Sequence, residues 1–255
     1  MSADRDKDFF IGWAETPRRD RRFFLGAGLA LMAGTGATAA GLAAFQAPVG
    51  PGMWDQGTVK TYTGVITAHP YPMLRTRDVT GAPQTALLSC LGKCGVGAQI
   101  GALEGQRVEV DGSLIQRGTH AMIAVAETSA WVRPAGTQSP PDPALAIPSR
   151  TPVLEAITLR GEILDTKCWF GAMRPSEGKV HKSCAALCIR AGLPPAFFAR
   201  DADGNASLLI MTNGEAAHGT AILPYVADPV EITGKVWRAG NILYLDAPPS
   251  ALIRI

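Results

Sequence analysis

Three cysteines and one histidine lie close together in the second half of the chain, at Cys168, His181, Cys184 and Cys188. Three thiolates and one imidazole make a complete tetrahedral ligand set for Zn²⁺, and soft thiolates also suit Cu(I). We therefore predict a metal site formed by these four residues, with zinc or copper as the bound metal. Met173 lies in the same segment and offers a further soft ligand for copper.

The spacing of Cys184 and Cys188 is that of neighbours on one helix face. Residues 183–191 are predicted to form a short helix, with Ser183 as N-cap and Gly192 as the C-terminal stop. Residues four apart on a helix have Cβ atoms about 5 to 6 Å from each other, whereas a disulfide needs about 3.5 to 4.5 Å. The two cysteines are thus poorly placed to bond to each other and well placed to bind a third group.

A structural disulfide is the alternative interpretation of the same residues. Cys168 could bond to Cys184 or Cys188, since compartments outside the cytoplasm are oxidising. A thiol pair that exchanges disulfides is a further alternative. Asp165 lies just before Cys168 and could orient a ligand, although one carboxylate decides nothing. The sequence leaves open whether this segment holds a metal or a disulfide.

A second cysteine pair, Cys90 and Cys94, lies in a Gly-rich loop that follows a predicted strand. The backbone can bend there enough to close a bridge between the two, and we predict a local disulfide. The chain contains five cysteines. Because this number is odd, at least one thiol must be free, paired with another molecule or bound to a ligand.

An internal repeat shows which part of the chain is additional. Residues 106–118 (QRVEVDGSLIQRG) align with residues 228–240 (DPVEITGKVWRAG). Both copies alternate apolar and polar residues over short runs rich in Val and Ile, with Gly between them, which is a strand pattern. The copies differ mainly by an insert at residues 165–195, and that insert carries the three cysteines of the predicted metal site.

Each copy of the repeat resembles the OB-fold, a five-stranded and partly open barrel. We predict a mainly β protein with two tandem OB-like small barrels, at residues 55–134 and 153–255, which follow an N-terminal transmembrane or signal helix. The Pro-rich residues 135–152 are predicted to be an extended linker that few contacts cross.

The second copy also resembles a family of uncharacterised bacterial extracytoplasmic proteins of OB-like build. The resemblance runs from Cys168 through Met211, with a Cys, then His-x2-Cys-Ala-x2-Cys, then Gly-x-Pro. It implies an extracytoplasmic domain and no established activity.

The N-terminal part has the pattern of an export signal or membrane anchor. No charged residue occurs from Phe23 to Trp54, and about 20 apolar residues suffice to cross a bilayer. We predict a cytoplasmic tail at residues 1–22 and a transmembrane or signal segment at residues 23–45, because arginines precede the span. The segment around Arg21 and Arg22 resembles the twin-arginine export signal. The expected location is the inner membrane, with most of the chain in the periplasm; whether the signal is cleaved stays open.

Composition and motifs limit the classes of function that the chain can have. The formal net charge is +2 with both signs interspersed, which predicts no nucleic-acid partner. Nucleophile-elbow, phosphate-loop, zincin and dinucleotide motifs are absent, which favours a non-enzymatic role without deciding it. We predict a membrane-anchored periplasmic accessory protein or subunit of a redox or metal-handling system, with a single membrane span and a periplasmic protein partner. The alternatives are a disulfide-stapled module that docks a partner enzyme and a thiol-disulfide exchange protein.

Overall fold

The computed structural model describes residues 18–45, 50–136, 142–200 and 206–255, and for residues 33–45 and 98–99 it describes the backbone alone. The chain divides into two compact units, Met1–Ala47 and Pro48–Ile255. The described part of the first unit is helix α1, Arg18–Phe45. Most of the predicted tail at residues 1–22 lies outside the described residues.

Helix α1 corrects the prediction of a membrane span. Among the described residues, no helix combines the length and the hydropathy that crossing a bilayer requires. Glycine and threonine recur along α1 between its leucine and methionine residues and lower the mean hydropathy of the helix. A membrane span needs predominantly apolar residues. The predicted transmembrane segment at residues 23–45, and with it the membrane as a partner, is therefore not supported.

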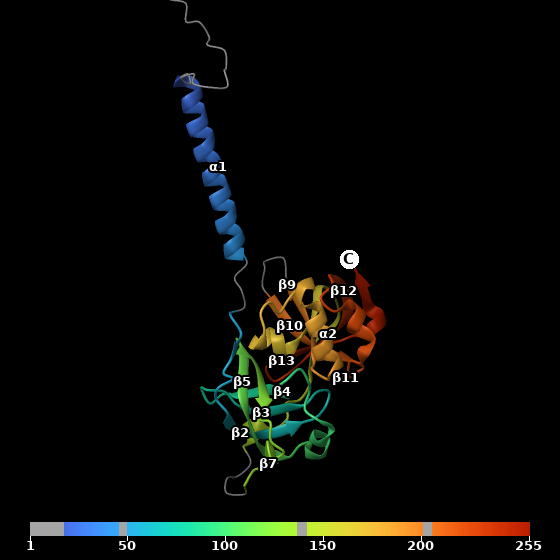
Figure 1. Ribbon diagram of the computed structural model, residues 1–255. Coiled ribbons are helices and arrows are strands. Elements are labelled where there is room, and N and C mark those ends of the chain that lie inside the picture. The colour runs from blue at the N-terminus through green and yellow to red at the C-terminus, as the bar shows by residue number, and fades with distance from the viewer. Residues whose placement is uncertain (1–17, 46–49, 137–141, 201–205) are drawn as a thin grey trace, which may run out of the picture. The chain divides into compact units, whose positions relative to one another are not determined.

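The second unit begins with a β-barrel drawn in blue-green to green in Figure 1. Its strands are β1 (Met53–Trp54), β2 (Lys60–Thr67), β3 (Met73–Arg77), β4 (Pro83–Ser89), β5 (Arg107–Arg117), β6 (His120–Val125) and β7 (Val132–Pro134). The ring β5-β2-β3-β4-β6 closes because β6 pairs with β5 as well as with β4. A closed ring leaves no unpaired strand edge among its members.

A second barrel follows, drawn in yellow to red in Figure 1. Its strands are β8 (Thr151–Asp165), β9 (Pro195–Arg200), β10 (Ala206–Asn213), β11 (Ala216–Ala217), β12 (Val230–Ala239), β13 (Ile242–Asp246) and β14 (Leu252–Arg254). The ring β12-β8-β9-β10-β13 has the same order as the first, and each ring contains one parallel pair, β4 with β6 and β10 with β13. The prediction of a mainly β protein with two small barrels is confirmed.

The remaining helices are short. Helix α2 spans Lys182–Arg190, and the short 3-10 and π-helical turns are η1 (Ala98–Leu103), η2 (Pro143–Leu145), η3 (Cys168–Ala172), η4 (Lys179–His181), η5 (Thr220–Tyr225) and η6 (Pro249–Ala251). Turns η1 and η5 occupy matching places, each before the long strand that closes its barrel. Turns η3 and η4 and helix α2 all fall in the insert between β8 and β9.

A glycine at the same place in each copy lets the first strand of the barrel pass close to its neighbour. A Cβ atom on Gly64 would lie 2.3 Å from the carbonyl oxygen of Arg75, and one on Gly161 would lie 2.1 Å from that of Phe198. Neither approach tolerates a side chain, because non-bonded carbon atoms settle about 3.5 to 4.0 Å apart. The matched glycines are thus a steric requirement of the barrel.

The two barrels share a hydrophobic core. One buried cluster joins Met73 and Met122 of the first barrel to Trp237 and Tyr244 of the second. The Tyr71 hydroxyl also donates a hydrogen bond to the Met211 carbonyl oxygen at 2.8 Å, across the boundary. The expectation that few contacts would cross between the two copies is therefore wrong, because apolar faces of both barrels bury each other.

Candidate metal site

The three cysteines of the insert come together at one point. The Sγ atoms of Cys168, Cys184 and Cys188 all lie within 4.8 Å of one another, and the Sγ atoms of Cys168 and Cys184 are 3.9 Å apart. Two thiolates on a tetrahedral metal with bonds of about 2.3 Å are separated by about 3.8 Å, whereas a disulfide bond is about 2.0 Å long. The spacing of Cys168 and Cys184 thus fits two ligands of one metal ion and is too long for a disulfide bond.

Local structure places each sulfur. Cys168 begins η3, directly after β8, and the other two cysteines lie one turn apart on α2. The predicted helix therefore exists, but Ser183 is not its N-cap: His181 occupies that position, and it makes no side-chain capping hydrogen bond. Gly192 ends the helix as expected, with φ of +95°.

Met173 brings a fourth sulfur to the cluster. Its Sδ atom lies 3.5 Å from the Sγ atom of Cys184. Its side chain is partly exposed, while Cys168 and Cys188 are buried. A thioether next to three thiols is a ligand environment that suits Cu(I).

His181 lies beside the cluster and is paired with Asp165. Its Nε2 atom is 3.0 Å from Oδ2 of Asp165, and both side chains are buried. The other carboxylate oxygen of Asp165 accepts a hydrogen bond from the backbone N–H of Cys168 at 2.8 Å. Asp165, Cys168 and His181 form a second group with donor atoms within 4.8 Å of one another, so His181 is close to one cysteine of the cluster. A carboxylate that orients an imidazole next to a metal is a common arrangement.

Lys93, which the sequence analysis did not select, reaches the cluster from the first barrel. Its Nζ atom lies 3.2 Å from the Sγ atom of Cys184, and this contact raises the pKa of Lys93. No local pattern could have identified it, because the contact joins residues 91 positions apart. The lysine supplies positive charge beside the thiols.

Lys167 holds the loop that carries Lys93. Its buried Nζ atom donates hydrogen bonds to three successive carbonyl oxygens, of Cys90 at 2.6 Å, Leu91 at 2.9 Å and Gly92 at 2.7 Å. Burial lowers the pKa of Lys167 to about 8, while the nearby thiols and Asp165 act in the opposite direction. The ammonium group thus links the loop of the first barrel to the insert of the second.

The loop is closed by a disulfide between Cys90 and Cys94, which confirms that prediction. The Cα atoms of the two cysteines are 5.4 Å apart. The backbone N–H of Gly95 donates to the carbonyl oxygen of Ala191 at 2.9 Å, directly after α2. The disulfide loop therefore lies against the helix that carries Cys184 and Cys188.

The two buried cysteines differ in how readily they lose a proton. A hydrogen bond from the Cys168 thiol lowers the pKa of Cys188, and the same hydrogen bond, together with burial, raises the pKa of Cys168. Of these two buried thiols, Cys188 is therefore the one that loses its proton more readily. A metal ion that enters the cluster replaces such protons.

A surface cavity of about 430 Å³ leads to the cluster. Cys168 and Met173 line it, together with Trp169, Arg117 and Arg174. The guanidinium of Arg117 lies over the Trp169 ring, 4.2 Å from its centroid. The cavity gives the sulfur atoms a route to solvent.

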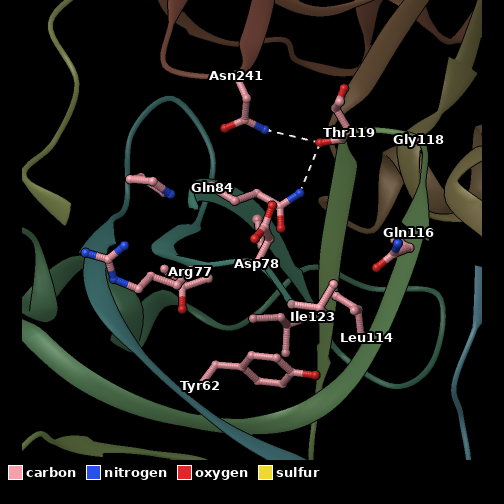
Figure 2. A pocket seen from close by; sticks show the side chains of 14 residues that line it. Tyr62, Arg77, Asp78, Gln84, Leu114, Gln116, Gly118, Thr119, Ile123 and Asn241 are labelled. Atoms are coloured by element: carbon pink, nitrogen blue, oxygen red, sulfur yellow. Dashed lines mark hydrogen bonds between the residues drawn. The ribbon is translucent and has the colours of Figure 1, made fainter. Parts of the chain in front are cut away.

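Another cavity of about 430 Å³ lies on the first barrel and has a different character. Figure 2 shows its lining, with the Gln84 and Asn241 amides converging on the carbonyl oxygen of Thr119. Its charged residues are already engaged, since Arg77 pairs with Asp142. Neither Cys nor His lines this cavity, so it offers no soft metal ligand.

Comparison with known proteins yields no family. No family model matches the chain, and no curated protein matches it. A solved structure with a weak likeness is a deletion mutant of the single-stranded DNA binding protein from Thermus aquaticus, at 12% identity and a TM-score of 0.18, covering 80% of this chain and 95% of that chain. A TM-score this low assigns neither a fold nor a function.

The partner prediction needs correction. Its membrane part fails because none of the helices described here qualifies as a span. Its exclusion of nucleic acid rested on the small net charge alone, which is too little to decide the point.

Proposed function

We propose that the protein is a soft-metal-binding accessory protein that works outside the cytoplasm, built on two OB-like barrels. Cys168, Cys184 and Cys188 bind one Cu(I) ion as thiolates. The observation that carries this proposal is the convergence of three sulfur atoms within 4.8 Å at free cysteines. The strand order shared by the two closed rings supports the OB-like description.

Positive charge lies close to the proposed thiolate ligands. Three thiolates and one Cu⁺ carry a net charge of −2, which is costly to bury unless it is compensated. Lys93 and Lys167 supply two positive charges next to the sulfurs.

The fourth ligand distinguishes the two metals. Met173 contacts Cys184 through its thioether sulfur, a soft ligand that suits Cu(I). His181 is the candidate fourth ligand for zinc, since it lies near Cys168 and is oriented by Asp165. We favour copper because Met173 contacts Cys184, a cysteine of the cluster, directly. His181, in contrast, is grouped with only one of the three cysteines, Cys168.

The test is a Cu(I) titration of the reduced protein under anaerobic conditions, against a chelator of known affinity. We expect one Cu(I) per chain, with all three cysteines of the insert protected from a thiol reagent. Cys188→Ser should abolish tight binding, and Met173→Leu should weaken Cu(I) but not Zn²⁺. The matched control is Cys90→Ser with Cys94→Ser, which removes two cysteines and leaves the ligand set intact.

Three results would count against this proposal. The first is three insert thiols that react freely in protein loaded with Cu(I). The second is binding that survives Cys188→Ser. The third is a Cys168 to Cys184 disulfide in the protein as purified from its native compartment, which would support the stapled or exchanging alternative, since those sulfurs are only 3.9 Å apart.

A further inference from the structure

A cavity of about 410 Å³ lies at the seam between the two barrels, away from the cysteines. Strand β3 contributes Met73 and Arg75, and strands β12 and β13 contribute Trp237, Ala239 and Tyr244. The segment that joins the barrels supplies a third wall through Ile147, Pro148 and Arg150. We call this cavity the seam pocket. Its volume lies within the range of small-molecule sites, about 300 to 1,000 Å³.

Arg75 is a partly buried cation without a counter-ion in the described chain. Its Nη1 atom donates only to neutral oxygens, Oγ1 of Thr85 at 3.1 Å and Oδ1 of Asn241 at 3.5 Å. No carboxylate of the residues described lies within ion-pair distance of it, whereas Arg77, on the same strand, pairs with Asp142. Burial lowers the pKa of Arg75, because partial desolvation disfavours its charged form.

Asn241 cannot compensate this charge, because its amide is already shared. Its Oδ1 atom also accepts a hydrogen bond from the Thr85 backbone N–H at 2.7 Å. Its Nδ2 atom donates to the carbonyl oxygen of Thr119, as Figure 2 shows. Asn241 therefore fixes one side of the Arg75 guanidinium and leaves the positive charge in place.

Two buried hydrogen-bond donors in the pocket wall have no acceptor in the described chain. Buried donors on two of its residues, Nε of Arg75 and Nε1 of Trp237, have no partner among the described residues. Glu104 also lines the pocket, but its carboxylate accepts from the Ala68 backbone N–H. Arg150 also lines the pocket, with its guanidinium carbon 4.7 Å from the Trp237 ring centroid, but its charge is paired with Glu215.

Two aromatic rings and a methionine form an apolar part of the wall, while Thr67, His69 and Thr85 add polar groups elsewhere in the lining. The rings of Trp237 and Tyr244 stack 3.7 Å apart with 4° between their planes. Met73 packs at the Tyr244 hydroxyl, with 3.3 Å between sulfur and oxygen. Such a surface suits an aromatic or aliphatic body, and the cation beside it suits an oxyanion.

We propose that the seam pocket binds a small organic anion, whose carboxylate pairs with Arg75 and whose apolar body lies against Met73, Trp237 and Tyr244. The site is independent of the metal site, since none of its lining residues is a cysteine of the cluster. A ligand there would touch both barrels and so strengthen the seam between them.

The test uses 2-naphthoate as the probe and 2-naphthamide as its uncharged match, with binding to the folded chain followed by calorimetry or ligand NMR. We expect 2-naphthoate to bind with one site per chain and 2-naphthamide to bind about tenfold to a hundredfold more weakly, because hydrogen bonds to charged groups are the stronger ones. Arg75→Met should remove this preference. Arg77→Met, the matched control on the same strand, should keep it.

Two further variants keep the test decisive. Arg75→Gln removes the charge with a polar side chain, in case the apolar substitution does not fold. Ala239→Phe should block both probes by filling the cavity. Equal affinity of the native chain for the two probes, a preference that survives Arg75→Met and Arg75→Gln, or no binding of 2-naphthoate at its solubility limit would each overturn the proposal.

Discussion

The side chains around the candidate metal site divide into sulfur ligands and the charges that set their environment. Cys168, Cys184 and Cys188 supply the sulfur, and Asp165 orients both His181 and the backbone at Cys168. Lys93 approaches from the other barrel. The chemistry therefore depends on residues from both copies of the repeat, although the cysteines belong to one.

His120 should make stability depend on pH below neutrality. Burial lowers its pKa from 6.5 to about 4, and Arg117 adds to this effect. His120 packs against the rings of Trp169 and Phe170, at 5.6 and 5.5 Å between centroids. Because its pKa is lower in the folded chain, the unfolded chain binds the extra proton first, and stability falls as pH drops from about 6.5 to 4.

The loss that His120 causes over this window should be about 3 kcal/mol. Denaturant unfolding at pH 7 and pH 4.5 measures it, with His120→Phe as the comparison. The variant should lose clearly less stability than the native chain between the two pH values. An identical loss in both proteins would show that His120 is not the group responsible.

At the scale of elements, the insert and the disulfide loop form one assembly. Lys167, at the end of the strand that leads into the insert, donates to the three carbonyls of the loop. Gly95 and Ala191 join the same loop to the end of α2 by a backbone hydrogen bond. The disulfide therefore closes the loop from which Lys93 contacts Cys184.

Removing the Lys167 ammonium should release the disulfide loop from the insert. Lys167→Met leaves three carbonyls without their donor, and we expect a loss of about 2 kcal/mol in the free energy of unfolding. Hydrogen exchange at the Gly95 amide should become faster. Lys179→Met, an exposed lysine in the same insert, is the control and should change neither quantity. Unchanged exchange at Gly95 in Lys167→Met would contradict this role.

Local patterns predicted the elements better than their mutual contacts. The strand alternation, the matched glycines and the Cys90 to Cys94 spacing are properties of neighbouring residues, and the structure bears out the barrels and the disulfide. The contact of Lys93 with Cys184 and the seam around Arg75 depend on how the two barrels pack against each other. The periodicity of apolar residues in the sequence does not indicate this packing. The N-cap of α2 was misassigned because the preceding turn η4 places His181 there.

At the scale of the whole molecule, the two barrels form one compact unit rather than two independent domains joined by a linker. Residues Pro48–Ile255 form a single unit, and the largest buried cluster takes side chains from both barrels. The repeat thus produced two similar rings whose facing surfaces are apolar. The metal site and the seam pocket both lie where residues of the two rings meet.

This shared core predicts that the barrels unfold together. Residues 48–255 should show one cooperative transition by circular dichroism and by tryptophan fluorescence, with coincident midpoints. Tyr71→Phe should lower the stability of the whole unit by about 1 to 2 kcal/mol, because the Met211 carbonyl and the His218 N–H both lose their bond to the buried hydroxyl. Tyr225→Phe, whose ring lies under Arg254 on the second barrel, is the matched control and should have little effect. Two separate transitions, or a Tyr71→Phe effect confined to one of them, would show that each barrel is stable without the other.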